Sequence, residues 1–271
     1  MRLAIEILRE KGLAASAKKA GRIAAEGMAY AAVVDGMGVV VEVNAETDFV
    51  AKNEKFTDFV KGVAATVAAN KPADLDALME CKYAGTDLTV TQQQQEMVLV
   101  IGENIKVRRF FFFAENTSVP YIHAGGKIGV LVNLKVEGGI DATEIGKDVA
   151  MQIAALNPRF WDKSQVTQDV LDEEKKIMLA QMDNDPKMAN KPEQVKVKIV
   201  EGKLNKFYAE NCLLQQDFVK DGEFTVEKYI ASAAKALGGT VTFVSAVRFE
   251  KGEGIEKRVD DFAAEVASMI K

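Results

Sequence analysis

The sequence predicts an α+β fold of two related subdomains with antiparallel strands and packed helices, plus a protruding helical hairpin and a C-terminal helix. Three observations predict it. Apolar residues recur with a helical period in some segments and alternate in others. A strand–connection–helix pattern occurs twice within the 271 residues. Two charged helical stretches are joined by a Pro-containing turn, as in an antiparallel helical hairpin.

The chain is expected to begin with a short N-terminal helix and a linker, within residues 1–27. Apolar positions predict the helix over residues 3–11, and Gly12 is expected to end it. Residues 14–27 are rich in Ala and Lys, which is typical of a surface linker or of a poorly packed helix.

The first core subdomain is expected over residues 28–115. A β-hairpin is predicted because strands 30–34 and 39–43 flank a turn that contains Asp35-Gly36, a strong hairpin signal. In residues 54–69 the apolar positions share one helical face, and Asn53 is a suitable N-cap. A further helix and strand are predicted over residues 92–103 and 105–113.

The second core subdomain is expected over residues 116–250, with the helical hairpin inserted at about 164–212. Its other elements are predicted as strands 121–123, 128–136 and 240–249 and helices 143–155 and 226–237. Residues 251–271 form a C-terminal helical module, with a helix over 260–269.

The two subdomains share an internal repeat. The strand at 38–43 matches the strand at 129–134, and the helix-and-Pro segment at 59–72 matches 145–158. The first copy carries five extra residues between its strand and its helix, within 45–53. The second copy manages without them, so this insertion is a candidate contact site rather than a part that the scaffold needs.

Composition excludes several classes of function. The net charge of −5 argues against broad nucleic-acid or anionic-membrane binding, which relies on clustered Lys and Arg. No apolar run is long enough to span a bilayer, and the charged N-terminus does not resemble a signal peptide, so a cytoplasmic protein is expected. With one His, two distant Cys and no nucleotide-binding or hydrolase motif, we expect no metal site, no cofactor and no catalytic residues.

Two places stand out as candidate sites, and each has a structural interpretation beside the functional one. In the insertion, Thr47 could cap a short helical turn while Phe49 packs into the local core. Alternatively the segment projects and presents Phe49 to a partner. His123 could be a loop histidine held by backbone groups, or a surface contact residue.

Motifs in order along nearly the whole chain resemble those of the elongation factor Ts family. They are Ala17-Lys18-Lys19-Ala20-Gly21, Thr47-Asp48-Phe49-Val50-Ala51-Lys52, Ile101-Gly102-Glu103-Asn104-Ile105, His123 with Ile128-Gly129-Val130-Leu131-Val132, Val200-Glu201-Gly202-Lys203, Arg248-Phe249-Glu250 with Gly252-Glu253-Gly254-Ile255-Glu256-Lys257, and Asp261-Phe262-Ala263-Ala264-Glu265-Val266-Ala267. One departure is that the family's three-helix, ubiquitin-associated-like N-terminal domain is represented only by its last helix.

The resemblance implies a guanine-nucleotide exchange factor that acts by binding, without covalent chemistry. Its partner would be elongation factor Tu, in the GDP-bound and nucleotide-free states. In the family, the segment that corresponds to Thr47, Asp48, Phe49 and Val50 intrudes beside the partner's magnesium site, and the histidine that corresponds to His123 also faces the partner. Some members self-associate through the hairpin, so a homodimer is a further expectation.

Two other classes of function remain open on the residues alone. A pure scaffold would use the hairpin to assemble partners without changing the rate of nucleotide release. A small-molecule enzyme would need convergent polar groups in a cleft between the subdomains, and the sequence displays no such set.

Overall fold

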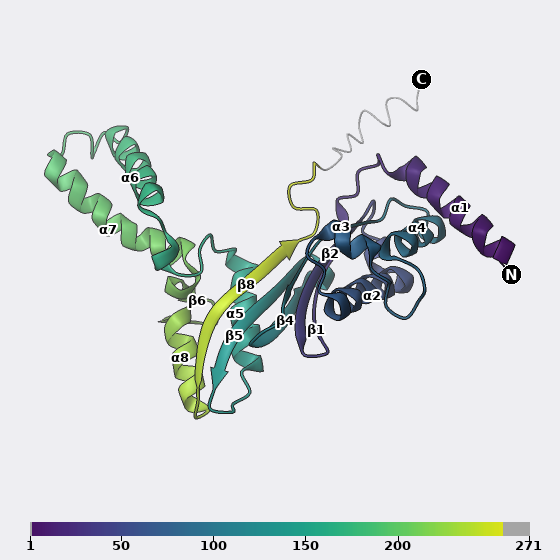
Figure 1. Cartoon of the computed structure of the whole chain (residues 1–271). Coiled ribbons are helices and arrows are strands. Elements are labelled where there is room, and N and C mark those ends of the chain that lie inside the picture. Colours follow the sequence, from purple (N-terminus) through teal and green to yellow (C-terminus); the bar gives the residue numbers. More distant parts are fainter. Residues whose placement is uncertain (1, 257–271) are drawn as a thin grey trace, which may run out of the picture. The chain divides into compact units, whose positions relative to one another are not determined.

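The computed structural model describes residues 2–256, and the predicted helix at 260–269 lies outside them (Figure 1). The chain divides into two compact units, one formed by residues up to 133 with residues from 246 onward, the other by residues 134–245. The predicted boundaries at 115/116 and 250/251 follow the sequence repeat instead, and they stay a prediction. The α+β class is confirmed.

In the first unit, three antiparallel strands form a sheet of order β1-β2-β3. Their bounds are Glu26–Val34 for β1, Met37–Ala45 for β2 and Lys106–Phe113 for β3. The predicted hairpin is confirmed, with a shorter turn than expected: only Asp35 and Gly36 connect the strands. Both have positive φ, 49° and 79°, which matches the twist of a two-residue hairpin.

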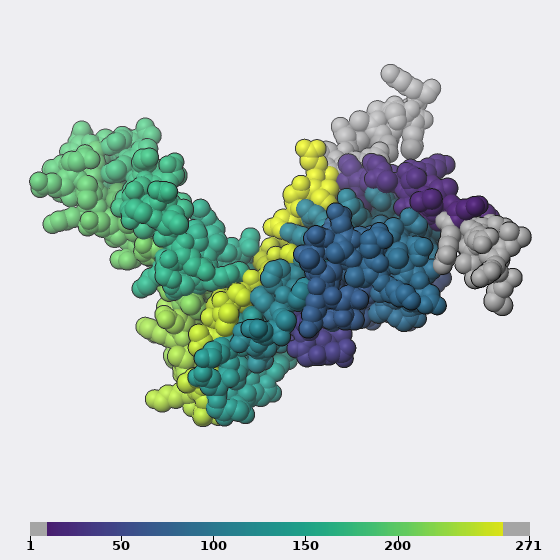
Figure 2. Space-filling view, in the orientation of Figure 1, coloured from purple at the N-terminus to yellow at the C-terminus, as the bar shows by residue number. Residues whose placement is uncertain are grey.

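Helices α2 (Glu54–Asn70), α3 (Leu75–Glu80) and α4 (Val90–Ile101) complete the core of this unit. One face of β2, with Val41 at its centre, packs among Phe56 and Phe59 of α2. In the space-filling view, the segment that contains these helices forms one continuous surface (Figure 2). The other face, with Val40, is buried against a second apolar cluster. Helix α3 was not predicted, because six residues are too few to show a periodic pattern.

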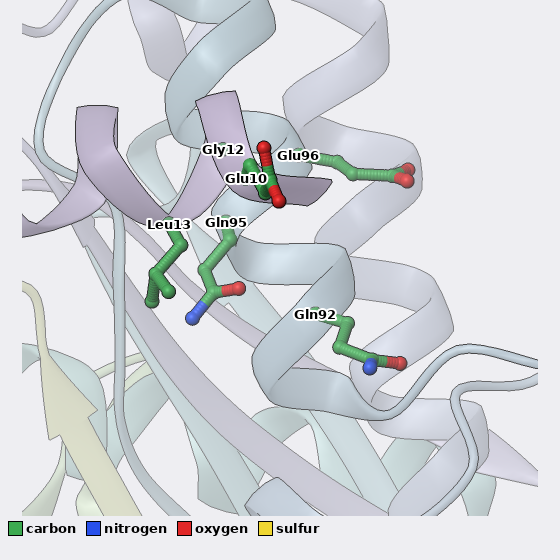
Figure 3. Close-up of a pocket in the computed structure, with 6 residues that line it drawn as sticks. All are labelled: Glu10, Gly12, Leu13, Gln92, Gln95 and Glu96. Carbon is green, nitrogen blue, oxygen red and sulfur yellow. The ribbon is translucent and has the colours of Figure 1, made fainter. Parts of the chain in front are cut away.

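Helix α1 runs from Arg2 to Lys19, so the prediction that it ends at Gly12 was wrong. A Cβ atom at Gly12 would lie 3.4 Å from the carbonyl oxygen of Gln95, an ordinary contact distance, so α1 packs directly against α4 at this point and continues through Gly12. A hollow of about 240 Å³ lies beside this crossing (Figure 3). It is lined by Glu10, Gly12, Leu13, Gln92, Gln95 and Glu96.

Strands β4 (Thr117–His123), β5 (Ile128–Glu137) and β8 (Thr240–Glu250) form a second sheet of order β4-β5-β8. The boundary between the two units falls inside β5 and β8. A short 3₁₀ turn, η2 (Ala124–Gly126), connects β4 to β5.

The second unit contains α5 (Thr143–Leu156), α8 (Val226–Ala236) and the small hairpin of β6 (Asp217–Phe218) and β7 (Asp221–Thr225). The predicted helical hairpin is present as α6 (Gln168–Asp183) and α7 (Glu193–Asn211), flanked by the 3₁₀ turns η3 (Lys163–Gln165) and η4 (Leu213–Gln215). Buried Lys196 of α7 pairs with Asp183 of α6 at 2.6 Å, which ties the two helices together.

Candidate functional site

Residues 46–53, called here the β2–α2 connection, join strand β2 to helix α2. Within them, Val50–Lys52 form a 3₁₀ turn, η1, in which the N–H of Lys52 donates to the carbonyl of Phe49 at 3.2 Å. The side chain of Asn53 then accepts a hydrogen bond from the N–H of Lys55 and caps α2, as predicted. The connection is therefore an ordered turn and not a loose loop.

Phe49 and Val50 point to opposite environments. Phe49 is 79% exposed, the largest exposed fraction of any large apolar side chain within residues 10–256, whereas Val50 is 6% exposed and packs in the core. Successive side chains of a helical turn are about 100° apart, so one can be buried while its neighbour faces solvent. The interpretation in which Phe49 packs into the local core is wrong.

Thr47 is held by Glu103, which follows the C-terminal end of α4. The Glu103 carboxylate accepts hydrogen bonds from the N–H groups of Glu46 and Thr47, both at 3.0 Å, and from the Thr47 hydroxyl at 2.7 Å. The structural interpretation expected Thr47 to cap the turn, and this expectation is wrong. Phe49 occupies the N-cap position, and its side chain makes no capping hydrogen bond.

Asp48 is exposed beside Phe49, and no hydrogen bond or ion pair to its carboxylate occurs among residues 2–256. A shallow hollow of about 410 Å³ lies where α2 begins and α4 ends. It is lined by Asn53, Glu54, Lys55, Val100 and Ile101. Asp48 and Phe49 together offer a carboxylate and an aromatic ring to solvent, a combination suited to a partner protein rather than to the interior.

His123 is the last residue of β4 and is exposed. Its Nδ1 atom lies 3.1 Å from the Tyr121 hydroxyl, and the two ring centroids are 6.0 Å apart. The interpretation as a histidine held by backbone groups is wrong, since its partner is a side chain. A contact role for His123 stays a prediction.

Sequence reasoning missed a buried charge cluster around Glu42 of β2. Glu42 is fully buried, and its carboxylate accepts from Arg108 and Asn44, both at 3.0 Å, from the N–H of Gly252 at 2.8 Å, and from Arg109. Burial by itself would raise the pKa of Glu42, but these donors together lower it below the ordinary value. The neighbouring Val-rich sequence gave no signal for this cluster, which fastens residues after β8 to the first sheet.

Two classes of site are absent from the described part of the chain. Residues 2–256 contain no group of three or more His, Cys, Asp or Glu side chains placed to hold a metal ion. None of the helices described there is long and apolar enough to cross a membrane.

The comparisons with known proteins agree with the motifs. The family model described as "Elongation factor TS" matches residues 46–253. A protein named elongation factor Ts from Syntrophotalea carbinolica is 48% identical over 99% of this chain and 88% of its own length. Proteins of the same name from Trichlorobacter lovleyi and Clostridium kluyveri are 46% and 45% identical, with the same shares covered.

Proposed function

This chain belongs to the elongation factor Ts family, and on that premise we propose that it is the guanine-nucleotide exchange factor of elongation factor Tu. It binds the GDP-bound partner, disturbs the magnesium site and promotes release of GDP, so that GTP can bind. It acts in the cytoplasm by protein–protein binding, without covalent chemistry and without a cofactor of its own.

The observation that carries the proposal is the exposed ring of Phe49. An isolated exposed phenylalanine gains nothing from folding, whereas burying such a side chain in a partner contributes roughly 1.5–3 kcal/mol. The ring stands on a turn fixed by the Glu103 carboxylate on one side and by buried Val50 on the other. Phe49 is therefore a suitable hot spot, a residue placed to wedge apart structures on the partner.

Exchange follows from negative coupling between two ligands of one protein. The factor and magnesium-bound GDP each bind elongation factor Tu, and each weakens the other's affinity by the same factor. Entry of Phe49 favours a partner conformation in which magnesium coordination is broken, and the Asp48 carboxylate approaches the water shell of the ion. Without magnesium, the GDP phosphates lose their main neutralising charge.

Not all four residues of the predicted contact segment act in the same way in this proposal. Asp48 and Phe49 face solvent and make the contact. Val50 is buried and Thr47 is bonded to Glu103, so both hold the segment in place. His123 is a second, separate surface contact.

Release of a fluorescent GDP analogue from elongation factor Tu, with and without this chain, tests the exchange function. Phe49→Ala should slow the stimulated release by about tenfold or more, the effect of a hot-spot residue. Phe111→Ala is the matched control, since Phe111 is also exposed, at 43%, in the same unit. Unchanged release with Phe49→Ala would refute the wedge mechanism, and no stimulation by the unaltered chain would refute the exchange function.

Self-association through the α6–α7 hairpin is a second candidate property. The hairpin exposes Ile177, Val195 and Val197 by 40% or more of their surfaces, an apolar set that a second copy could cover. Analytical ultracentrifugation of the chain, with and without Val195→Lys/Val197→Lys, tests it. A monomer at all concentrations would exclude the homodimer.

A further inference from the structure

We infer that Glu103 is a positioning residue for exchange, because its carboxylate fixes the segment that carries Phe49. This inference rests on the proposed function. It assigns a role to a residue that touches neither the nucleotide nor, in this proposal, the partner. Glu103 lies 54 positions after Phe49 in the sequence and reaches the β2–α2 connection from the end of α4.

The geometry is that of a carboxylate clamp. Oε2 of Glu103 accepts from two consecutive backbone N–H groups, those of Glu46 and Thr47, and Oε1 accepts from the Thr47 hydroxyl. Hydrogen bonds to an ionised acceptor are shorter and stronger than neutral ones. A single half-buried side chain therefore fixes the last turn of backbone before Asp48.

The clamp is reciprocal. Glu46 in turn accepts a hydrogen bond from the N–H of Asn104 at 2.6 Å, and it pairs with Arg22 at 3.5 Å. The Asn104 side chain donates to the carbonyl of Arg22 at 2.7 Å. The Glu103 carboxylate thus binds the backbone of residues 46–47, and the Glu46 carboxylate binds the backbone of Asn104. Arg22, which follows α1, contacts both Glu46 and Asn104.

The opposite end of the connection is fixed independently. Val50 is buried in the core, and Asn53 caps α2. Only Asp48 and Phe49 are left between the two attachments. An exposed ring on a fixed turn loses little conformational freedom on binding, whereas a ring on a loose loop must be ordered at the expense of affinity.

The test uses the full chain and measures stimulated release of a fluorescent GDP analogue from elongation factor Tu. Glu103→Ala removes both acceptor oxygens, and with them all three hydrogen bonds. It should reduce the stimulated rate by about five- to tenfold, since partly buried charged hydrogen bonds are lost. Thr47→Val removes only the hydroxyl bond and should cost about twofold. Glu115→Gln, on an exposed turn of the same unit, is the matched control and should leave the rate unchanged.

A double-mutant cycle separates positioning from a general structural role. If Glu103 acts through Phe49, then adding Glu103→Ala to Phe49→Ala should lower the rate by less than about twofold, because residues that act as a unit are not additive. A full additional five- to tenfold loss in the double variant would overturn the inference.

A measurement on the free chain tests the role of Glu103 without depending on nucleotide exchange. With 4-fluorophenylalanine at position 49, the ¹⁹F signal of the free chain should change in shift and linewidth in Glu103→Ala but not in Glu115→Gln. If the signal is the same in both variants, the clamp does not position the ring. If the signal responds but Phe49→Ala leaves GDP release unchanged, the clamp stands and the wedge mechanism fails.

Discussion

The two copies of the strand–connection–helix repeat differ most in the connection. Residues 46–53 join β2 to α2 in the first copy, and residues 138–142 join β5 to α5 in the second. The long connection displays Phe49 to solvent. The short one is packed closely: a Cβ atom at Gly138 would lie 2.9 Å from the Cα of Gly239, and Ala142 is buried.

The comparison shows how one scaffold can serve two purposes. The second connection only links β5 to α5, and its two glycines at positive φ form a tight turn. The first is longer and is held by residues from outside the repeat unit, through the side chain of Glu103 and the backbone N–H of Asn104. Not all of the five extra residues lie in the connection, since α2 also starts earlier than α5 relative to the matched apolar positions.

The strands differ as well, at one matched position. Glu42 in β2 is fully buried and satisfied by four donors, whereas no described residue donates to the buried Oδ1 atom of its counterpart, Asn133 in β5. The charge is thus specific to the first copy. Its partners Arg108, Arg109 and Gly252 bring β3 and the residues after β8 together around β2.

The largest effect is expected from Glu42→Ala, which leaves two arginines facing an empty site. Breaking a buried ion pair costs about 3–5 kcal/mol of unfolding free energy. Asn133→Ala should cost less than about 2 kcal/mol, because no ion pair is broken. Urea denaturation of both variants measures the difference, and equal losses would show that the matched positions are energetically alike.

A second difference lies within the long connection. Val50→Ala should lower the unfolding free energy by about 2 kcal/mol, because a buried side chain is truncated. Phe49→Ala should change it by less than about 0.5 kcal/mol, because the ring is exposed. Thermal denaturation checks the pair. A large stability loss for Phe49→Ala would mean that the ring supports the fold rather than a partner.

The short connection can be tested by adding a methyl group to each of its glycines. Gly138 and Gly139 both have positive φ, 90° and 67°, but only the first lacks space for a Cβ atom. Gly139→Ala should cost about 1 kcal/mol from backbone strain, and Gly138→Ala about 1 kcal/mol more from the clash. Thermal denaturation measures both variants. If their melting temperatures are equal, the backbone at Gly138 is not closely packed against Gly239.

The smallest effect concerns pH. The pKa of Glu42 is lower in the folded chain than in the unfolded chain, so its stabilisation is present above about pH 4.3 and is lost as pH falls through the lower folded value. As pH falls, the unfolding free energy should therefore decrease less steeply in Glu42→Gln than in the unaltered chain. Urea denaturation at each pH gives the two curves of unfolding free energy against pH. If these curves are parallel between pH 5 and 3, the pKa of Glu42 is not lowered.

Much of this architecture was predictable from local patterns. Asp35-Gly36 marked the hairpin, Asn53 marked the start of α2, and the repeat pointed to the connection that carries Phe49. These features depend on neighbours in sequence, where turn and capping chemistry is readable.

The rest depends on contacts between residues distant in sequence. Nothing near Glu42 indicates that Arg108 and the N–H of Gly252 will meet it, and nothing near Thr47 indicates Glu103. The continuation of α1 through Gly12 was hidden for the same reason, since its packing partner is on α4. Exposure of Phe49 was only one of two open interpretations until the structure placed Val50 in the core.

In the proposed mechanism, the Phe49 ring leaves solvent and enters elongation factor Tu when GDP is expelled. With 4-fluorophenylalanine at position 49, relaxation of the ¹⁹F signal by a soluble paramagnetic reagent reports how exposed the ring is. We expect strong relaxation in the free chain and strong protection in the nucleotide-free complex. A ring that stays as accessible in that complex as in the free chain would contradict this mechanism.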